Sequence, residues 1–82
     1  MQNITIHIEY FALFRAAAQR TNETMSTHLV NLIDLFEFLK SKYQFPLNRE
    51  SVLVAVNESY AAWESKIQDG DRIVFLPPMA GG

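Results

Sequence analysis

The sequence predicts one α+β domain, a sheet with helices over one of its faces. Two observations predict this class: strand-like segments alternate with two helix-like segments, and 49% of the 82 residues are hydrophobic, which is enough for a core. No linker, repeat or low-complexity stretch divides the chain. Residues 1–82 are therefore expected to form a single domain, with a flexible C-terminal tail at 77–82.

The N-terminal part is expected to contain a strand, a short helix and a second strand. Residues 4–9 alternate apolar isoleucines with polar residues, which predicts a half-buried strand. Alanine, leucine and arginine favour a short helix over 11–18. Thr21-Asn22 ends this helix, and a short polar edge strand is expected over 23–27.

The clearest helix is predicted for residues 32–43. Asn31 is a suitable N-cap, and Asp34 lies near the positive end of the helix dipole. Lys40 and Lys42 lie in the last turn, where positive charge is favoured. The apolar positions at helical spacing are Leu32, Leu35, Phe36, Leu39 and Tyr43.

The C-terminal part is expected to supply three strands. Residues 51–56 are apolar on both faces, as in a central strand. Asn57-Glu58 suits a tight turn into a short strand around Tyr60. Asp69-Gly70-Asp71 is a turn, and the last strand covers 72–76.

The last strand is apolar at every position from 73 to 76, so one set of its side chains must point away from the helices. A large exposed apolar patch often marks a docking site. Alternatively, loops or the first helix cover these side chains. The candidates for the patch are Phe11, Tyr60 and Leu76.

The composition excludes several classes of function. The absence of cysteine rules out a disulfide, a thiolate metal site and an iron–sulfur cluster. A net charge of −2 and scattered basic residues argue against nucleic acid or a membrane surface as partner. His7 and His28 have no partner at metal-ligand spacing, so no metal or bound cofactor is expected. Neither a membrane span nor a signal peptide is present, so a cytoplasmic protein is expected.

The chain ends in an unusual tail, Leu76-Pro77-Pro78-Met79-Ala80-Gly81-Gly82. The prolines lack amide protons and favour an extended course, which projects the last residues away from the body of the domain. The glycines carry no side chain, so the end fits a channel too narrow for other residues. The tail is either a functional thread or a frayed terminus.

The terminal carboxylate of Gly82 suggests a use for such a thread. A carboxylate is a poor electrophile, but adenylation by a partner enzyme would give it AMP as a leaving group. Attack by sulfide or a persulfide would then yield a thiocarboxylate, a soft nucleophile that a second partner can receive. Because the chain has no cysteine, this sulfur must come from elsewhere.

Several segments resemble one known family, the molybdopterin synthase small subunit (MoaD), a family of ubiquitin-like sulfur carriers. The resemblance covers nearly the whole chain, and the Pro-Pro-x-x-Gly-Gly ending is its most specific part. The segments are Tyr10-Phe11-Ala12-Leu13-Phe14-Arg15, Asp34-Leu35-Phe36-Glu37-Phe38-Leu39-Lys40, Val54-Ala55-Val56-Asn57-Glu58, Asp69-Gly70-Asp71-Arg72-Ile73 and Phe75-Leu76-Pro77-Pro78-Met79-Ala80-Gly81-Gly82.

The resemblance implies a β-grasp, ubiquitin-like fold with a mixed sheet. It also implies that an E1-like, MoeB-like adenylyltransferase consumes ATP to activate Gly82, which Gly81 precedes. The loaded tail would then enter the large subunit of a heterotetrameric synthase and donate sulfur to cyclic pyranopterin monophosphate, forming the molybdopterin dithiolene. The chain would act as the sulfur-donating subunit and not as an enzyme alone. The partner-binding positions would be Phe11, Tyr60, Leu76, Pro77, Pro78, Met79 and Ala80.

Two departures from the family and two other functions stay open. Gln19-Arg20 stands where the family often has a glycine, so the geometry of that turn is uncertain, and Met79 replaces a common valine. The chain could instead carry sulfur for thiamine, thiolated tRNA or cysteine, although Leu76-Pro77-Pro78 is unlike the usual thiamine carrier ending. It could also be a ubiquitin-like modifier joined to lysines, or a plain interaction module.

Overall fold

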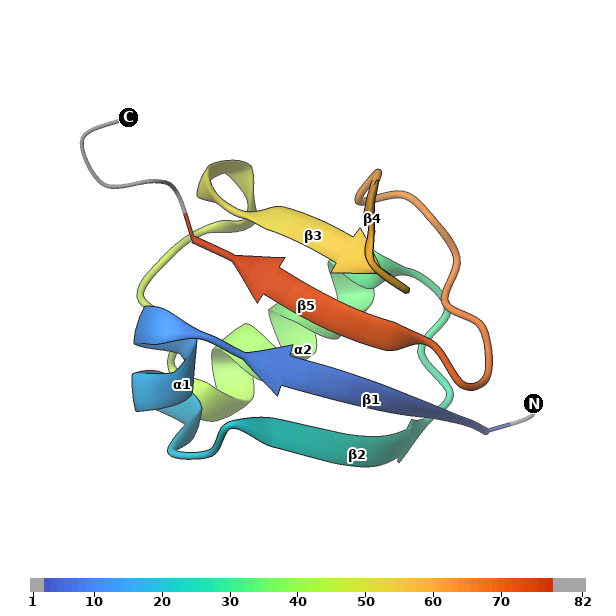
Figure 1. The fold of residues 1–82 in the computed structure, drawn as a ribbon, viewed down its shortest axis with the longest axis horizontal. Helices are drawn as coiled ribbons and strands as arrows, with labels where there is room; N and C mark the ends of the chain where they lie inside the picture. The colour runs from blue at the N-terminus through green and yellow to red at the C-terminus, as the bar shows by residue number, and fades with distance from the viewer. Residues whose placement is uncertain (1–2, 78–82) are drawn as a thin grey trace.

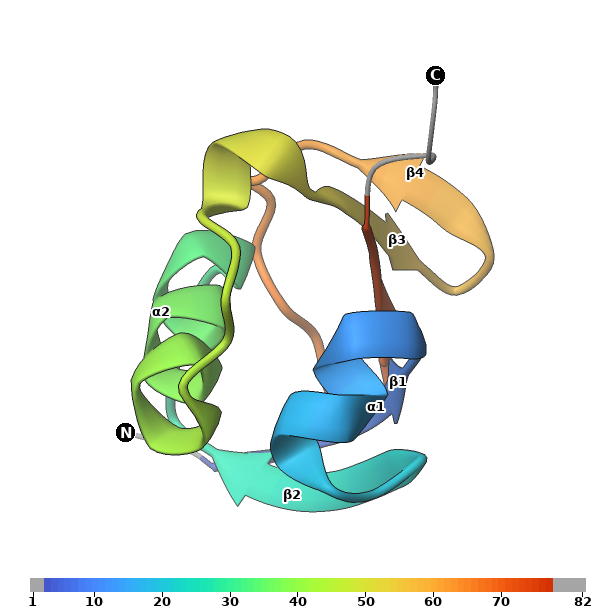
Figure 2. The ribbon, with the colours of Figure 1, turned by 90° about the vertical axis from the view of Figure 1, so that its left-hand side faces the viewer.

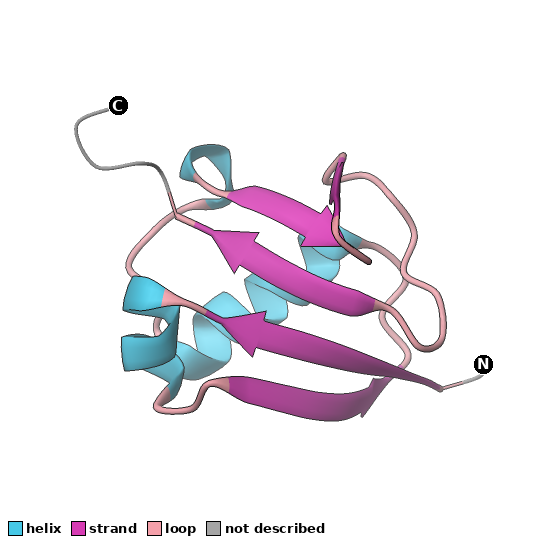
Figure 3. Ribbon diagram, viewed as in Figure 1, coloured by secondary structure: helices cyan, strands magenta, loops and turns pink. Residues whose placement is uncertain are grey.

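The computed structural model describes residues 3–77, which form a five-stranded sheet with the helices on one face (Figures 1 and 3). Strand β1 pairs in parallel with β5, and the other pairs are antiparallel, so the sheet is mixed. The predicted α+β class is confirmed. The sheet order is β2-β1-β5-β3-β4. The elements are β1 (Ile4–Tyr10), α1 (Ala12–Ala18), β2 (Asn22–Thr27), α2 (Leu32–Tyr43), the 3₁₀ helix η1 (Arg49–Ser51), β3 (Leu53–Val56), β4 (Ser59–Ala61) and β5 (Arg72–Leu76).

The helices cover one face of the sheet and leave the other face open, as Figure 2 shows end-on. The alternation along β1 assigns its side chains to these faces: Ile6, Ile8 and Tyr10 are buried, whereas Thr5 and His7 are exposed. The isoleucine periodicity in the sequence therefore identified the buried side of β1 correctly.

The core between the sheet and α2 is rich in aromatic rings. Phe36 of α2 lies 5.2 Å from Phe75 of β5, measured between ring centroids, in an edge-to-face arrangement. Phe14 of α1 contacts Phe45 in the same way, at 5.0 Å. Trp63 closes the core from the β4 side, where its Nε1 donates to the Val52 carbonyl at 3.2 Å. These contacts join every layer of the domain into one core.

Helix α2 begins and ends where the sequence predicts. The Asn31 side chain accepts a hydrogen bond from the Asp34 backbone N–H at 2.9 Å, which caps the helix. Gln44 adopts a left-handed conformation after the last turn and donates its N–H to the Lys40 carbonyl. Local sequence signals alone were sufficient for this element.

The strand predicted for residues 51–56 needs two corrections. The chain makes a 3₁₀ turn over Arg49–Ser51, because the Ser51 N–H bonds the Asn48 carbonyl at 3.0 Å, and β3 begins only at Leu53. The expectation of two buried faces is also wrong at Leu53, whose side chain is 58% exposed.

Residues with a left-handed backbone conformation end α1 and form the turns before β4 and β5. Gln19 has φ 58° and ψ 39° and ends α1 with an N–H bond to the Arg15 carbonyl, so the turn that usually has glycine tolerates glutamine here. Asn57 and Glu58 have φ values of 52° and 73° and form the β3–β4 turn. Gly70, with φ 86°, sits in the predicted turn before β5.

Candidate functional site

The open face of the sheet divides into a polar half and an apolar half. One row across the strands shows this division, since the pairing places Asn22, Glu9, Val74, Ala55 and Tyr60 side by side from β2 to β4. We define the apolar half as Phe11, Leu53, Ala55, Tyr60, Val74 and Leu76. We define the polar half as His7, Glu9, Asn22, Thr24 and Arg72.

The structure brings the three predicted docking residues to this same face. Tyr60 is 74% exposed and Phe11 is 39% exposed, while Leu76 is half-buried. Phe11 lies here because it extends the alternation of His7 and Glu9 beyond β1, with φ −122° and ψ 154°. Tyr60 is therefore largely uncovered, whereas Arg15 of α1 reaches over the Phe11 ring, and the docking role of the three residues stays a prediction.

Leu53 is a surface residue that sequence reasoning missed. It pairs with Leu76 across β3 and β5, so the two leucines extend the apolar half beside the end of β5. The apolar run at 51–56 suggested a buried residue, because the sequence does not reveal which strand lies beside which. Only the strand pairing places Leu53 beside Leu76 on the open face.

The chain leaves the sheet at Pro77, directly after Leu76. Strand β5 is the middle strand of the sheet, and its last residues lie between the end of β1 and the start of β3 (Figure 1). The tail therefore departs from the border of the apolar half. The remaining predicted tail residues, Pro78, Met79, Ala80, Gly81 and Gly82, lie outside the described part of the chain.

A carboxylate at the β2 edge is enclosed by groups of the chain itself. Glu23 accepts hydrogen bonds from the hydroxyls of Tyr10, at 2.9 Å, and Tyr43, at 2.7 Å. The side chains of Arg20 and Lys42 form ion pairs with it at 3.5 and 3.7 Å. The cluster ties β2 to β1 and to the end of α2, so we assign it a structural role.

This enclosure determines how Glu23 and its partners ionise. Burial by itself would raise the pKa of the Glu23 carboxyl, but the two tyrosine hydroxyls and the charges of Lys42 and Arg20 outweigh it and lower the pKa. Burial and the neighbouring carboxylate raise the pKa of both Tyr10 and Tyr43. Glu23 is therefore charged, and both hydroxyls are protonated, at neutral pH.

The described residues give no indication of bound metal chemistry. Within 3–77, no three His, Asp or Glu side chains gather at a distance that suits a metal ion. His7 instead contacts the Thr24 hydroxyl through Nδ1, at 3.0 Å. No helix in this range is long and apolar enough to cross a lipid bilayer.

A family model described as the ThiS family matches residues 8–82, nearly the whole chain and its final glycines. The chain belongs to the ThiS family. A relative from Drosophila yakuba named molybdopterin synthase sulfur carrier subunit is 31% identical to this ThiS-family chain, over 96% of the chain and 92% of the relative. The family resemblance seen in the sequence is thereby confirmed.

Solved structures show the same fold. A putative molybdopterin converting factor subunit 1 from Pyrococcus furiosus is 27% identical, with a TM-score of 0.78, over 93% of this chain and 99% of that one. In a complex of subunits 1 and 2 of the molybdopterin-converting factor from Helicobacter pylori, a chain matches with a TM-score of 0.66 at 21% identity, over 96% of this chain and 100% of that one. The predicted β-grasp fold of this ThiS-family chain is confirmed.

Proposed function

We propose that this chain is the sulfur-carrier small subunit of a molybdopterin synthase, and that the carboxylate of Gly82 carries the sulfur. The observation that carries the proposal is the family match over residues 8–82, which includes both terminal glycines. A relative that matches over 96% of the chain has the corresponding name. The tail begins at the border of an exposed apolar surface, which fits a carrier that must present its terminus to partner proteins.

The proposed chemistry takes place at the last acyl carbon. The Gly82 carboxylate attacks the α-phosphate of ATP in an E1-like, MoeB-like adenylyltransferase, and pyrophosphate leaves. Sulfide then attacks the acyl carbon of the adenylate, and AMP leaves with the oxygen, so that one carboxylate oxygen is exchanged for sulfur. Glycine at this position gives the least crowded acyl group for both attacks.

The second half of the proposed cycle returns the carboxylate. The thiocarboxylate sulfur attacks an electrophilic carbon of cyclic pyranopterin monophosphate, an oxygen substituent leaves that carbon, and a thioester joins carrier and pterin. Water then cleaves the acyl–sulfur bond, so that the thiol stays on the pterin and the Gly82 carboxylate is restored. A dithiolene contains two sulfur atoms, so two loaded carriers are consumed for each molybdopterin. The chain supplies the sulfur and its binding surface, while the large subunit of the heterotetrameric synthase holds the pterin.

The apolar half gives each partner a place to bind. Tyr60 and Leu53 are the most exposed apolar side chains on this face. Aromatic anchors such as Tyr60 often dominate the binding energy of an interface. Because Pro77 follows Leu76, which pairs with Leu53, a partner that covers this end of the apolar half lies where the described chain leaves the sheet.

Deletion of Gly82 tests the proposal. We expect the shortened chain to unfold at the same urea concentration as the full chain, and to support no molybdopterin formation with the activating enzyme, ATP, sulfide, the large subunit and the pterin precursor. A truncated chain that still supports the reaction would contradict the proposed role of Gly82. A carrier for another pathway would be loaded with sulfur but would fail to convert the pterin.

A further inference from the structure

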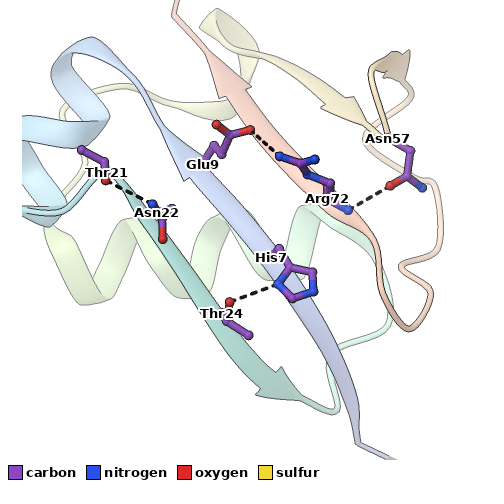
Figure 4. A network of polar contacts seen from close by, with 7 residues as sticks. All are labelled: His7, Glu9, Thr21, Asn22, Thr24, Asn57 and Arg72. Atoms are coloured by element: carbon purple, nitrogen blue, oxygen red, sulfur yellow. Dashed lines mark hydrogen bonds and ion pairs between the residues drawn. The ribbon is translucent and has the colours of Figure 1, made fainter.

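The polar half of the open face lies beside the proposed docking surface and has no part in the tail chemistry. Figure 4 shows its side chains on the side of the sheet away from α2. They surround a shallow hollow of about 400 Å³. Its polar and charged lining residues are His7, Glu9, Asn22, Glu23, Thr24 and Arg72.

Arg72 is the most exposed charged residue of this hollow, and its backbone is held by two hydrogen bonds. Its N–H donates to the Asn57 side-chain oxygen at 3.0 Å, and its carbonyl accepts from the Asn57 N–H at 2.8 Å. Its side chain is 61% exposed and, among residues 3–77, makes one polar contact, from Nη2 to Glu9 Oε1 at 3.4 Å. A guanidinium has five N–H donors, so most of them remain available to a ligand.

The contact between Arg72 and Glu9 contributes little to folding. Glu9 is itself 43% exposed, and exposed pairs of this kind contribute little to stability because water screens the charges. A guanidinium pairs far better with a carboxylate that meets it through two parallel hydrogen bonds in a desolvated interface. Arg72 is therefore better suited to bind an incoming carboxylate than to stabilise the sheet.

The other side chains that line the hollow are polar, apart from the buried Ile8 of β1. His7 contacts Thr24 from the neighbouring strand at 3.0 Å, which fixes the wall opposite Arg72. This wall offers polar contacts and no apolar anchor.

The charges are arranged around the apolar half. Arg72 is hydrogen-bonded to Asn57 of the β3–β4 turn and lies two residues before Val74, which belongs to the apolar half. At the other end, the Arg15 guanidinium lies 6.0 Å from the centre of the Phe11 ring. Exposed arginines thus lie at two ends of the apolar half, with the carboxylates of Glu9 and Glu58 exposed at the same border. A complementary partner surface is apolar at its centre and carries carboxylates at its rim.

We propose that the polar half orients the large subunit of the synthase, called here the accepting subunit because it receives the loaded tail. Arg72 binds a carboxylate of this subunit while the apolar half covers its apolar surface. This inference rests on the proposed function and adds a residue that determines which partner docks, and in which orientation. The continuity of the two halves across the Glu9–Val74 pairing allows one partner to cover both.

Reversal of the ion pair tests this inference. The double variant Glu9→Arg/Arg72→Glu keeps the net charge and can remake the same contact in the opposite sense. We expect its association rate constant with the accepting subunit to fall about tenfold or more at low salt, with a weaker dependence on salt than the natural chain shows. The single variant Arg72→Ala should show a smaller loss. Stopped-flow mixing measures these rates.

Matched controls separate the possible outcomes. The single variants Arg72→Glu and Lys66→Glu change the net charge by the same amount, but Lys66 lies away from the open face, in a bridge with Asn31 before α2. If the position of the charge decides the rate, Arg72→Glu should slow association about tenfold or more and Lys66→Glu less than threefold. An unimpaired double variant would show that the pair serves only the fold and would overturn the inference. A double variant that binds the activating enzyme more slowly, but the accepting subunit at the natural rate, would also overturn the inference. If the natural chain fails to bind the accepting subunit at all, the proposed function itself is wrong.

Discussion

The two faces of this sheet show how one small domain separates stability from recognition. The face beneath the helices is filled by buried aliphatic and aromatic side chains, and the hydroxyls of Tyr10 and Tyr43 bond to Glu23 within the chain. The open face holds exposed apolar side chains in one half and lightly paired charges in the other. Substitutions on the first face should therefore change folding, and those on the second should change binding.

The largest effect on stability is expected beneath the helices. Phe36→Ala removes a ring that contacts Phe14, Phe45, Trp63 and Phe75, and should cost about 3–5 kcal/mol of unfolding free energy. A small domain has only about 5–15 kcal/mol in total. Urea unfolding followed by circular dichroism measures the loss. A loss below about 1 kcal/mol would show that this layer does not form the core.

A substitution on the open face should weaken binding and leave the free energy of unfolding nearly unchanged. Leu53→Asp places a charge in the apolar half beside Leu76, and we expect binding to the accepting subunit to weaken about tenfold or more. Stability should change by about 0.5 kcal/mol or less, because the side chain is already exposed. Calorimetric titration and urea unfolding give the two numbers. Unchanged binding would remove Leu53 from the docking surface.

A smaller effect is expected at the β2 edge. Glu23→Gln keeps an acceptor for Tyr10 and Tyr43 but removes the charge, and should cost about 1–2 kcal/mol at pH 7. The control Glu37→Gln, on the exposed side of α2, should stay within about 0.5 kcal/mol.

The pH dependence of the same cluster is set by the lowered pKa of Glu23. Its contribution to stability is complete above the ordinary value of 4.5 and is lost as the pH falls from there through the lower pKa of the folded state. The natural chain should therefore lose more stability than Glu23→Gln over that range. Parallel curves for the two proteins would contradict the assignment.

The smallest predicted effect concerns the cap of α2. Asn31→Ala removes the side-chain acceptor for the Asp34 N–H and should cost about 1 kcal/mol. Asn48 precedes η1 without a capping bond from its side chain, so Asn48→Ala is a matched control that should cost a few tenths of a kcal/mol. Equal losses would show that the Asn31 bond contributes nothing specific. Thermal unfolding resolves the difference.

The sequence predicts features that depend on neighbouring residues better than features that depend on how the strands pair. Helix α2 was predictable because its cap, apolar spacing and terminal charges lie within one short segment. The exposure of Leu53 and the enclosure of Glu23 were not predictable, because each depends on residues far away in the sequence. Phe11, Tyr60 and Leu76 remain predicted docking residues, and their neighbours on the open face could be found only from the strand order.

The central claim is that the chain carries sulfur on its own terminus, and the intact mass of the protein tests it most directly. After incubation with the activating enzyme, ATP and sulfide, we expect a mass gain equal to the exchange of one oxygen for one sulfur, confined to the peptide that ends in Gly82. An unchanged mass would contradict the claim, as would a terminus joined to a lysine through an isopeptide bond.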